Sequence, residues 1–366
     1  MKRTIILLLI ILGCYVLGLG IGSVIVGNGF SMDWPGISII IMTFVGLIVG
    51  LFVNIVLHEA GHLVGGLLTG YRFLSFRIGN QALTHDEAGW HRKVYNIPGT
   101  AGQCLMRPPV LKEGEMMPYF WYNVGGVVMN MLVILICAVL VATVNMPRPM
   151  LMFVLMLMFC GAWLFLLNAI PMTPSGVPND GKNICTLRCH PEARMSFLRM
   201  MKVMEAQTDG LRLTEMPTEW FTVEPLPKKP NVMQLSDRNI YQCWLYDGMR
   251  LDEARQVAEE ILQTGKRLPQ YMRMETESDL VLLELATLNR KDRVDTLWNK
   301  KLQQYVRTSV QYSPMKSATL YAYECMVNGN MAKAQTYYDE VQRNLDSYPM
   351  PGEARTALAL MEKIGC

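Results

Sequence analysis

Four long runs of apolar residues in the first half of the chain constrain its fold more than any other feature. They cover residues 4–27, 37–57, 120–144 and 150–170. Each run has about the 20 residues that a helix needs to cross the hydrocarbon core of a bilayer. The sequence therefore predicts a mainly α-helical fold whose first half is a polytopic membrane helix bundle of about four spans. The first run is long for a signal peptide, so we interpret it as an anchor.

The charged residues lie mostly in the second half, over residues 181–366. This division predicts a membrane half followed by a soluble half. The formal net charge of the whole chain is only +3 and is diffuse. Such a charge gives no reason to expect a nucleic-acid partner.

Basic residues in the short loops predict the orientation of the spans. The 28–36 segment has no basic residue, and the 145–149 segment has only Arg148. The 71–118 loop has six: Arg72, Arg77, Arg92, Lys93, Arg107 and Lys112. Because basic loops stay on the cytoplasmic side, we expect this loop and both termini to be cytoplasmic. The predicted location is the cell membrane, with several passes.

The motif that carries chemistry stands at the end of the second run, where residues 58–62 read His-Glu-Ala-Gly-His. On a helix, residues four apart share a face, so His58 and His62 can bind one zinc ion. Glu59 would then lie beside the open coordination position and accept a proton from the attacking water. The alternative is a pair of buried histidines that only form hydrogen bonds. Ionisable groups in membrane helices are costly and usually functional, which favours the metal site.

A catalytic zinc ion needs a third protein ligand, and the sequence offers three sources. The longer pattern HExxHxxGxxH fails, because its last position is Leu68. Glu87 follows His62 at a plausible distance but stands in a polar stretch that is typical of a solvated turn. Asp180 follows the fourth run, which should return the chain to the side of the membrane that holds His58. We expect Asp180 to complete the site.

Four further motifs follow HExxH along the chain. A glycine-rich segment, 123–130, ends in Asn130, and an NxxP pattern begins at Asn168. Asp180 is followed by glycine, and the loop contains a glycine-rich stretch, 97–103, that includes Gly102. With these motifs, residues 37–185 resemble the site-2 protease family of intramembrane metalloproteases. One departure is Asn179, since the family often has leucine before the Asp-Gly pair.

The resemblance implies a role for each matching residue. His58, His62 and Asp180 would be zinc ligands, and Glu59 the general base. Asn168 would hold substrate near the metal. Asn130 would position groups at the site, although packing between membrane helices is an equally simple role for it.

The 71–118 loop is the predicted place of substrate binding. Its 73–78 and 94–106 stretches are strand-like, so we expect a small β-like region on the cytoplasmic side. A zinc peptidase needs its substrate as an extended strand, because a helix shields the scissile carbonyl. We expect these stretches to lie beside His58 and to bind substrate by strand addition, with Gly102 among the positioning residues. The alternative is an ordinary cytoplasmic loop.

The second half shows a weak internal repeat. Motifs beginning at Leu251, Lys291 and Met331 are each 40 residues apart. The third, continued by Tyr337, resembles a tetratricopeptide repeat. We predict a membrane domain over 1–205, a proline-rich linker over 206–237, and an α-solenoid over 238–366. Such a domain usually binds a protein partner, and the alternative is that it only packs on the membrane half.

These features predict a zinc endopeptidase that hydrolyses peptide bonds of a membrane-inserted or membrane-associated protein. The alternative is a catalytically silent metal-binding scaffold or immunity-type protein of the same fold. The presence of Glu59 favours the enzyme, because a scaffold needs no base. A transporter is less expected, since the sequence shows four spans and no inverted repeat.

Overall fold

The computed structural model describes residues 34–365 except 87, 88, 96, 98, 99, 113, 174–176, 223, 266, 267 and 289. The predicted run over 4–27 lies outside the described residues. Contacts divide the chain into two compact units. The first holds the long apolar helices, and the second holds a small sheet and the C-terminal helices. The chain is mainly helical, as predicted.

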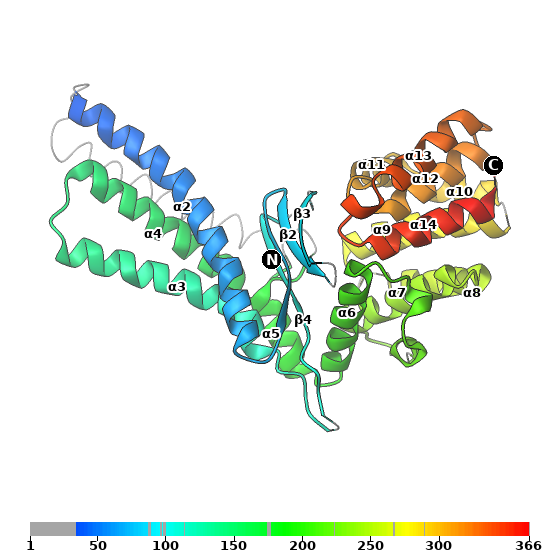
Figure 1. Ribbon diagram of the computed structural model, residues 1–366, viewed down its shortest axis with the longest axis horizontal. Coiled ribbons are helices and arrows are strands. Elements are labelled where there is room, and N and C mark those ends of the chain that lie inside the picture. The colour runs from blue at the N-terminus through cyan, green and yellow to red at the C-terminus, as the bar shows by residue number, and fades with distance from the viewer. Residues whose placement is uncertain are drawn as a thin grey trace. The chain divides into compact units, whose positions relative to one another are not determined.

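Three helices of the first unit are long and apolar enough to cross a membrane. They are α2 (Trp34–Leu67), α3 (Phe120–Thr143) and α4 (Arg148–Ala169). Figure 1 shows these three helices next to one another. They match the second, third and fourth predicted runs. The helix α2 continues beyond residue 57 to Leu67, so the HExxH motif is helical. These helices indicate a membrane-associated protein.

Glycines allow α2 to approach its two neighbours closely. A Cβ atom at Gly61 would lie 2.2 Å from the carbonyl oxygen of Gly125 on α3, and one at Gly65 would lie 2.1 Å from that of Trp121. Towards the other end of α2, a Cβ atom at Gly46 would lie 2.9 Å from the Cα of Phe153 on α4. Small residues four apart are typical of close helix contacts in membranes. This packing brings the second half of α2 against the first half of α3.

The 71–118 loop forms a four-stranded antiparallel sheet in the order β3-β2-β1-β4. The strands are β1 (Arg72–Ile78), β2 (Gln81–Asp86), β3 (Gly89–Val94) and β4 (Gly102–Arg107). The predicted β-like region is confirmed, and β1 and β4 overlap the predicted 73–78 and 94–106 stretches. A two-residue turn joins β1 to β2, and its Gly79 has φ +58°, which glycine adopts without strain. The two edge strands are β3 and β4.

The sheet belongs to the second unit through contacts with its helices. Arg107 of β4 forms ion pairs with Glu205 at 2.8 Å and Asp209 at 2.6 Å, at the end of α6 (Ala193–Thr208). The Nζ of Lys93 on β3 donates to the backbone oxygen of Tyr348 at 3.1 Å. The predicted domain boundary at residue 205 therefore falls inside α6, the helix that forms ion pairs with the sheet.

The 206–237 segment, predicted as a linker, contains two short 3-10 helices, Leu213–Glu215 and Thr218–Phe221. The side chains of Leu213, Met216 and Phe221 are buried against α6 and α7. The ring of Phe221 stacks on that of Trp244 with centroids 5.3 Å apart. Apolar side chains thus attach this proline-rich segment to the helices on either side.

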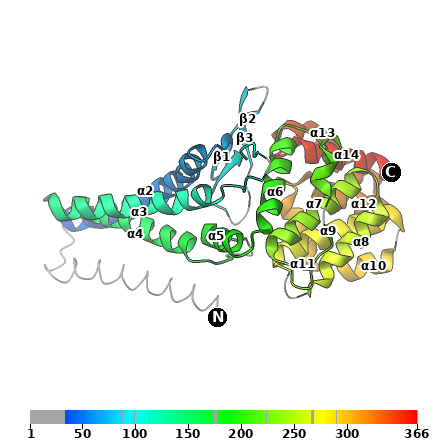
Figure 2. The same cartoon turned by 90° about the horizontal axis from the view of Figure 1, so that it is seen from below.

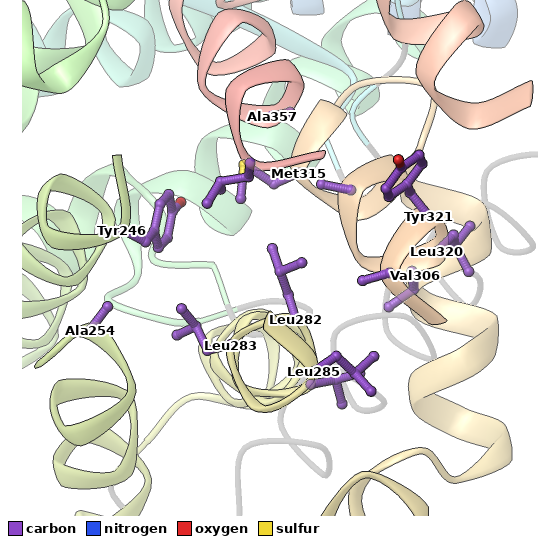
Figure 3. Close-up of a cluster of buried hydrophobic side chains, with 14 of the residues drawn as sticks. Tyr246, Ala254, Leu282, Leu283, Leu285, Val306, Met315, Leu320, Tyr321 and Ala357 are labelled. Atoms are coloured by element: carbon purple, nitrogen blue, oxygen red, sulfur yellow. The ribbon is translucent and has the colours of Figure 1, made fainter. Parts of the chain in front are cut away.

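The remaining helices share one apolar core, part of which Figure 3 shows around Leu282, Leu283 and Met315. Figure 2 shows these helices gathered together. They are α7 (Val232–Asp247), α8 (Leu251–Gln263), α9 (Gln270–Thr287), α10 (Lys291–Leu297), α11 (Lys300–Ser309), α12 (Pro314–Met326), α13 (Met331–Arg343) and α14 (Pro351–Ile364), with a 3-10 turn at Leu345–Ser347. The repeat motifs at Leu251, Lys291 and Met331 each begin a helix, namely α8, α10 and α13. Whether the helices form a solenoid stays a prediction.

Candidate metal centre

Two histidines of α2 and one aspartate of α5 (Asp180–Cys189) converge in the first unit. The Nε2 atoms of His58 and His62 lie 3.2 Å and 3.4 Å from the Oδ2 of Asp180. The two Nε2 atoms are 3.2 Å apart. All three side chains are largely buried. This geometry brings together the three residues that the sequence suggested, and they could hold a metal ion.

Asn179 determines where Asp180 lies. Its Oδ1 accepts from the backbone N–H of Lys182 at 2.9 Å, which caps the start of α5, and from that of Met172 at 3.0 Å. Its Nδ2 donates to the backbone oxygen of Ile170 at 2.7 Å, just after α4. The asparagine that departs from the family pattern therefore joins the end of α4 to the start of α5. Leucine could form none of these bonds.

Each imidazole is oriented through its other nitrogen. The Nδ1 of His58 lies 2.8 Å from the Oδ1 of Asn130, and the Nδ1 of His62 lies 2.7 Å from the backbone oxygen of Tyr122. Because both partners are acceptors, both Nδ1 atoms carry the proton and donate it. Both Nε2 atoms therefore present a lone pair towards Asp180, as metal-binding histidines do.

A bound cation would balance the negative charge of the Asp180 carboxylate beside the two neutral imidazoles. The Oδ2 of Asp180 is buried and receives no well-formed hydrogen bond from the described residues. Three electron-rich atoms thus meet within a few ångströms, and a bound metal ion would satisfy all of them. The donor set fits a metal.

Two more residues border the three ligands. Glu59 follows His58 on α2, and its residue exposure is 8 %, the same as that of each histidine. A Cβ atom at Gly126 would lie 2.6 Å from the His58 ring and 2.7 Å from the Nε2 of His62. Glycine at this position of α3 leaves the space that the two imidazoles occupy.

The other predicted site residues are placed as follows. Asn130 is fully buried and contacts His58. Asn168 lies near the end of α4, where its Nδ2 donates to the backbone oxygen of Leu164 at 3.0 Å. Gly102 begins β4 in the second unit. Glu87, the other candidate for the third ligand, lies outside the described residues.

Two groups at the site were not predicted. One is the backbone oxygen of Tyr122, which no sequence pattern identifies. The other is Asn54, which is fully buried and bonded to Asn130. Its signal was present in the sequence: it is the one amide within the apolar 37–57 run, four residues before His58.

No family model, curated protein or solved structure matches this chain. The likeness to site-2 proteases therefore rests on the motifs alone and stays a prediction.

Proposed function

We propose that the protein is an intramembrane zinc endopeptidase of the site-2 protease type. The observation that carries the proposal is the convergence of His58, His62 and Asp180, with Glu59 on the same helix as the two histidines. The two histidines and Glu59 lie on α2, which is itself one of the apolar spans, and Asp180 begins α5, which follows the span α4. A membrane-inserted or membrane-associated peptide is the substrate that fits such a position.

Zinc is the metal we propose for the site. Two neutral imidazoles and one carboxylate are a common donor set for catalytic zinc, and they leave a position open for substrate. When bound, zinc would supply Lewis-acid chemistry. Three groups of the chain orient the ligands: Asn130 and the backbone oxygen of Tyr122 fix the imidazoles, and Asn179 places the carboxylate.

Glu59 is the proposed general base. A carboxylate beside the metal ligands can accept a proton from water as the water attacks the scissile carbonyl, and can pass it to the leaving amine. Its low exposure keeps competing bulk water away from this carboxylate. Asn168 is proposed to hold substrate near the metal.

The sheet is proposed to present the substrate as a strand. β4 is an edge strand, so one side of its backbone is not paired within the sheet. The backbone N–H of Gly79 donates to the oxygen of Ala101 at 2.8 Å, so Ala101 faces β1. In an antiparallel pair alternate residues face the partner, which directs the backbone N–H of Gly102 outwards. An extended substrate could pair with this edge.

The finer topology and the role of the C-terminal helices are also proposals. Residues 4–27 would form a fourth span, with both termini in the cytoplasm. The helices α7 to α14 would form a tetratricopeptide-like solenoid that binds a protein partner. The start of a helix at each repeat motif supports this reading.

Glu59→Gln tests the proposed function, with Glu115→Gln in the exposed loop as the matched control. New N-termini of membrane proteins are compared by mass spectrometry in cells that express each variant at equal levels. We expect a set of cleavages in or beside membrane spans that the wild type and the control produce and Glu59→Gln does not. The proposal fails if the wild type produces no such cleavages, or if Glu59→Gln produces them equally.

A further inference from the structure

Asn54 is a buried amide in the middle of α2, among residues that are otherwise apolar. It is completely inaccessible to solvent. A polar side chain in a membrane span is costly and usually has a role. Its Nδ2 donates to the backbone oxygen of Gly50 at 2.8 Å and to that of Leu157 on α4 at 3.1 Å. Gly161 of α4 leaves room for this amide, since a Cβ atom there would lie 2.9 Å from the Oδ1 of Asn54.

The amide of Asn130 lies between Asn54 and His58. Its Nδ2 donates to the backbone oxygen of Asn54 at 3.0 Å and lies 3.3 Å from the Oδ1 of the same residue. Its Oδ1 accepts from the Nδ1 of His58 at 2.8 Å. A series of hydrogen bonds therefore runs from α4 through α2 and α3 to one of the candidate metal ligands.

Obligate acceptors fix the direction of this series. Backbone oxygens can only accept, so the oxygens of Gly50 and Leu157 determine which end of the Asn54 amide is Nδ2. The Oδ1 of Asn54 and its backbone oxygen then both face Asn130, which must present its own Nδ2 to them. The Oδ1 of Asn130 is left for His58, so the proton of the neutral imidazole must be on Nδ1. The Nε2 lone pair then faces Asp180.

We propose that Asn54 is a positioning residue that sets the tautomer and orientation of His58 through Asn130. The expected effect on zinc binding rests on the proposed function, whereas the effect on the His58 tautomer does not. Without the side chain of Asn54, the Nδ2 of Asn130 keeps only the backbone oxygen of residue 54 as an acceptor, so the orientation of the Asn130 amide is less firmly fixed. Asn130 could then rotate and present Nδ2 to His58, which would favour the tautomer with the proton on Nε2 and remove the lone pair that a metal needs.

The experiment uses the full-length protein in detergent, with Asn54→Leu as the main variant. Leucine has a similar size and removes every hydrogen bond of the amide. Thr43→Val is the matched control, because Thr43 is also on α2 and its hydroxyl bonds only the backbone oxygen of Ile39 among the described residues. Asn54→Ala is the second variant, in case leucine prevents folding.

The first measurement is the tautomer of His58 in metal-free protein, by NMR of histidine labelled with nitrogen-15. We expect the wild type and Thr43→Val to carry the proton on Nδ1, and the Asn54 variants to show the other tautomer or a mixture. The second measurement is the zinc dissociation constant, which should rise by about tenfold to a hundredfold in the Asn54 variants.

A double-variant cycle separates positioning from a general loss of packing. If Asn54 acts through Asn130, the zinc affinity of Asn54→Ala with Asn130→Ala should equal that of Asn130→Ala alone. Losses that add, or a wild-type tautomer in both Asn54 variants, would overturn the inference. If the tautomer changes but even the wild type binds no zinc, Asn54 positions His58 as inferred and the proposed function is what fails.

Discussion

A methyl group at Gly126 would lie within 2.7 Å of both imidazoles of the candidate metal centre. Gly126→Ala should therefore displace His58 or His62 and weaken zinc binding by about tenfold or more. Zinc competition with a chromogenic chelator would measure the change. Gly248→Ala is a suitable control, because a Cβ atom there meets nothing closer than 3.5 Å. An unchanged affinity in Gly126→Ala would mean that the two rings do not pack on this glycine.

The sequence was sufficient to predict which three side chains converge, but not which groups orient them. His58, His62 and Asp180 are recognisable because their residue types and order carry the chemistry. The contact of Asn130 with His58 supports the positioning role, but packing and positioning both predict a buried asparagine, so that role stays a prediction. The part played by the backbone oxygen of Tyr122 depends on how closely α2 and α3 approach. No residue type encodes a backbone acceptor.

At the scale of elements, the contact between α2 and α3 depends on Gly61 and Gly125. Gly61→Ala would place a methyl group 2.2 Å from the carbonyl oxygen of Gly125, in backbone that cannot move aside cheaply. We expect a loss of about 1–3 kcal/mol in the free energy of unfolding, as overpacked interiors show. Thermal unfolding in detergent would measure it. Val64→Ala, on an exposed face of α2, should change stability far less, and equal losses in both variants would contradict this packing.

The edge of β4 gives a second prediction at this scale. Gly102→Pro removes the outward-facing backbone N–H, whereas Gly102→Ala keeps it. The proline variant should cleave substrate more slowly at unchanged zinc content, and the alanine variant should cleave as the wild type does. The measurement is the cleavage rate of a peptide whose cleavage has been shown to require Glu59. Strand addition at β4 would be wrong if the two variants cleave equally well.

The elements themselves could be predicted to different degrees. The three described spans follow from the length of their apolar runs alone. β1 and β4 carry enough apolar residues to be recognised, but β2 and β3 do not. β3 contains Arg92 and Lys93, which resemble a solvated loop in the sequence. Lys93 is nevertheless buried, because its Nζ donates to the backbone oxygen of Tyr348, 255 positions away in the chain. A contact over that separation leaves no local pattern.

For the molecule as a whole, the second unit contains a buried carboxyl group, that of Glu353, which should make its stability depend on pH. Burial raises the pKa of Glu353 in α14 from its usual 4.5 to about 7, although Ser313 donates to its Oε1 at 2.9 Å and Lys316 is close. The folded chain therefore keeps a proton that the unfolded chain has released. This stabilisation is complete below the unfolded pKa of 4.5 and is lost as the pH rises through about 7.

Glu353→Gln stays neutral at every pH, so it should not show this loss. Relative to the wild type, its melting temperature should increase as the pH is raised from below 4.5 to above 7. Circular dichroism at a series of pH values would follow the transition. Glu340→Gln on the exposed face of α13 is the control and should follow the wild type. Parallel pH profiles for the wild type and Glu353→Gln would show that Glu353 is ionised in the folded protein.

The metal content of the purified protein tests the central claim most directly. Prepared without chelators, the wild type should contain about one zinc ion per chain by elemental analysis. His58→Ala, His62→Ala and Asp180→Ala should each lose it, whereas Glu59→Gln and Glu87→Ala should retain it. A wild type without zinc, or zinc that survives Asp180→Ala and is lost in Glu87→Ala, would contradict the account.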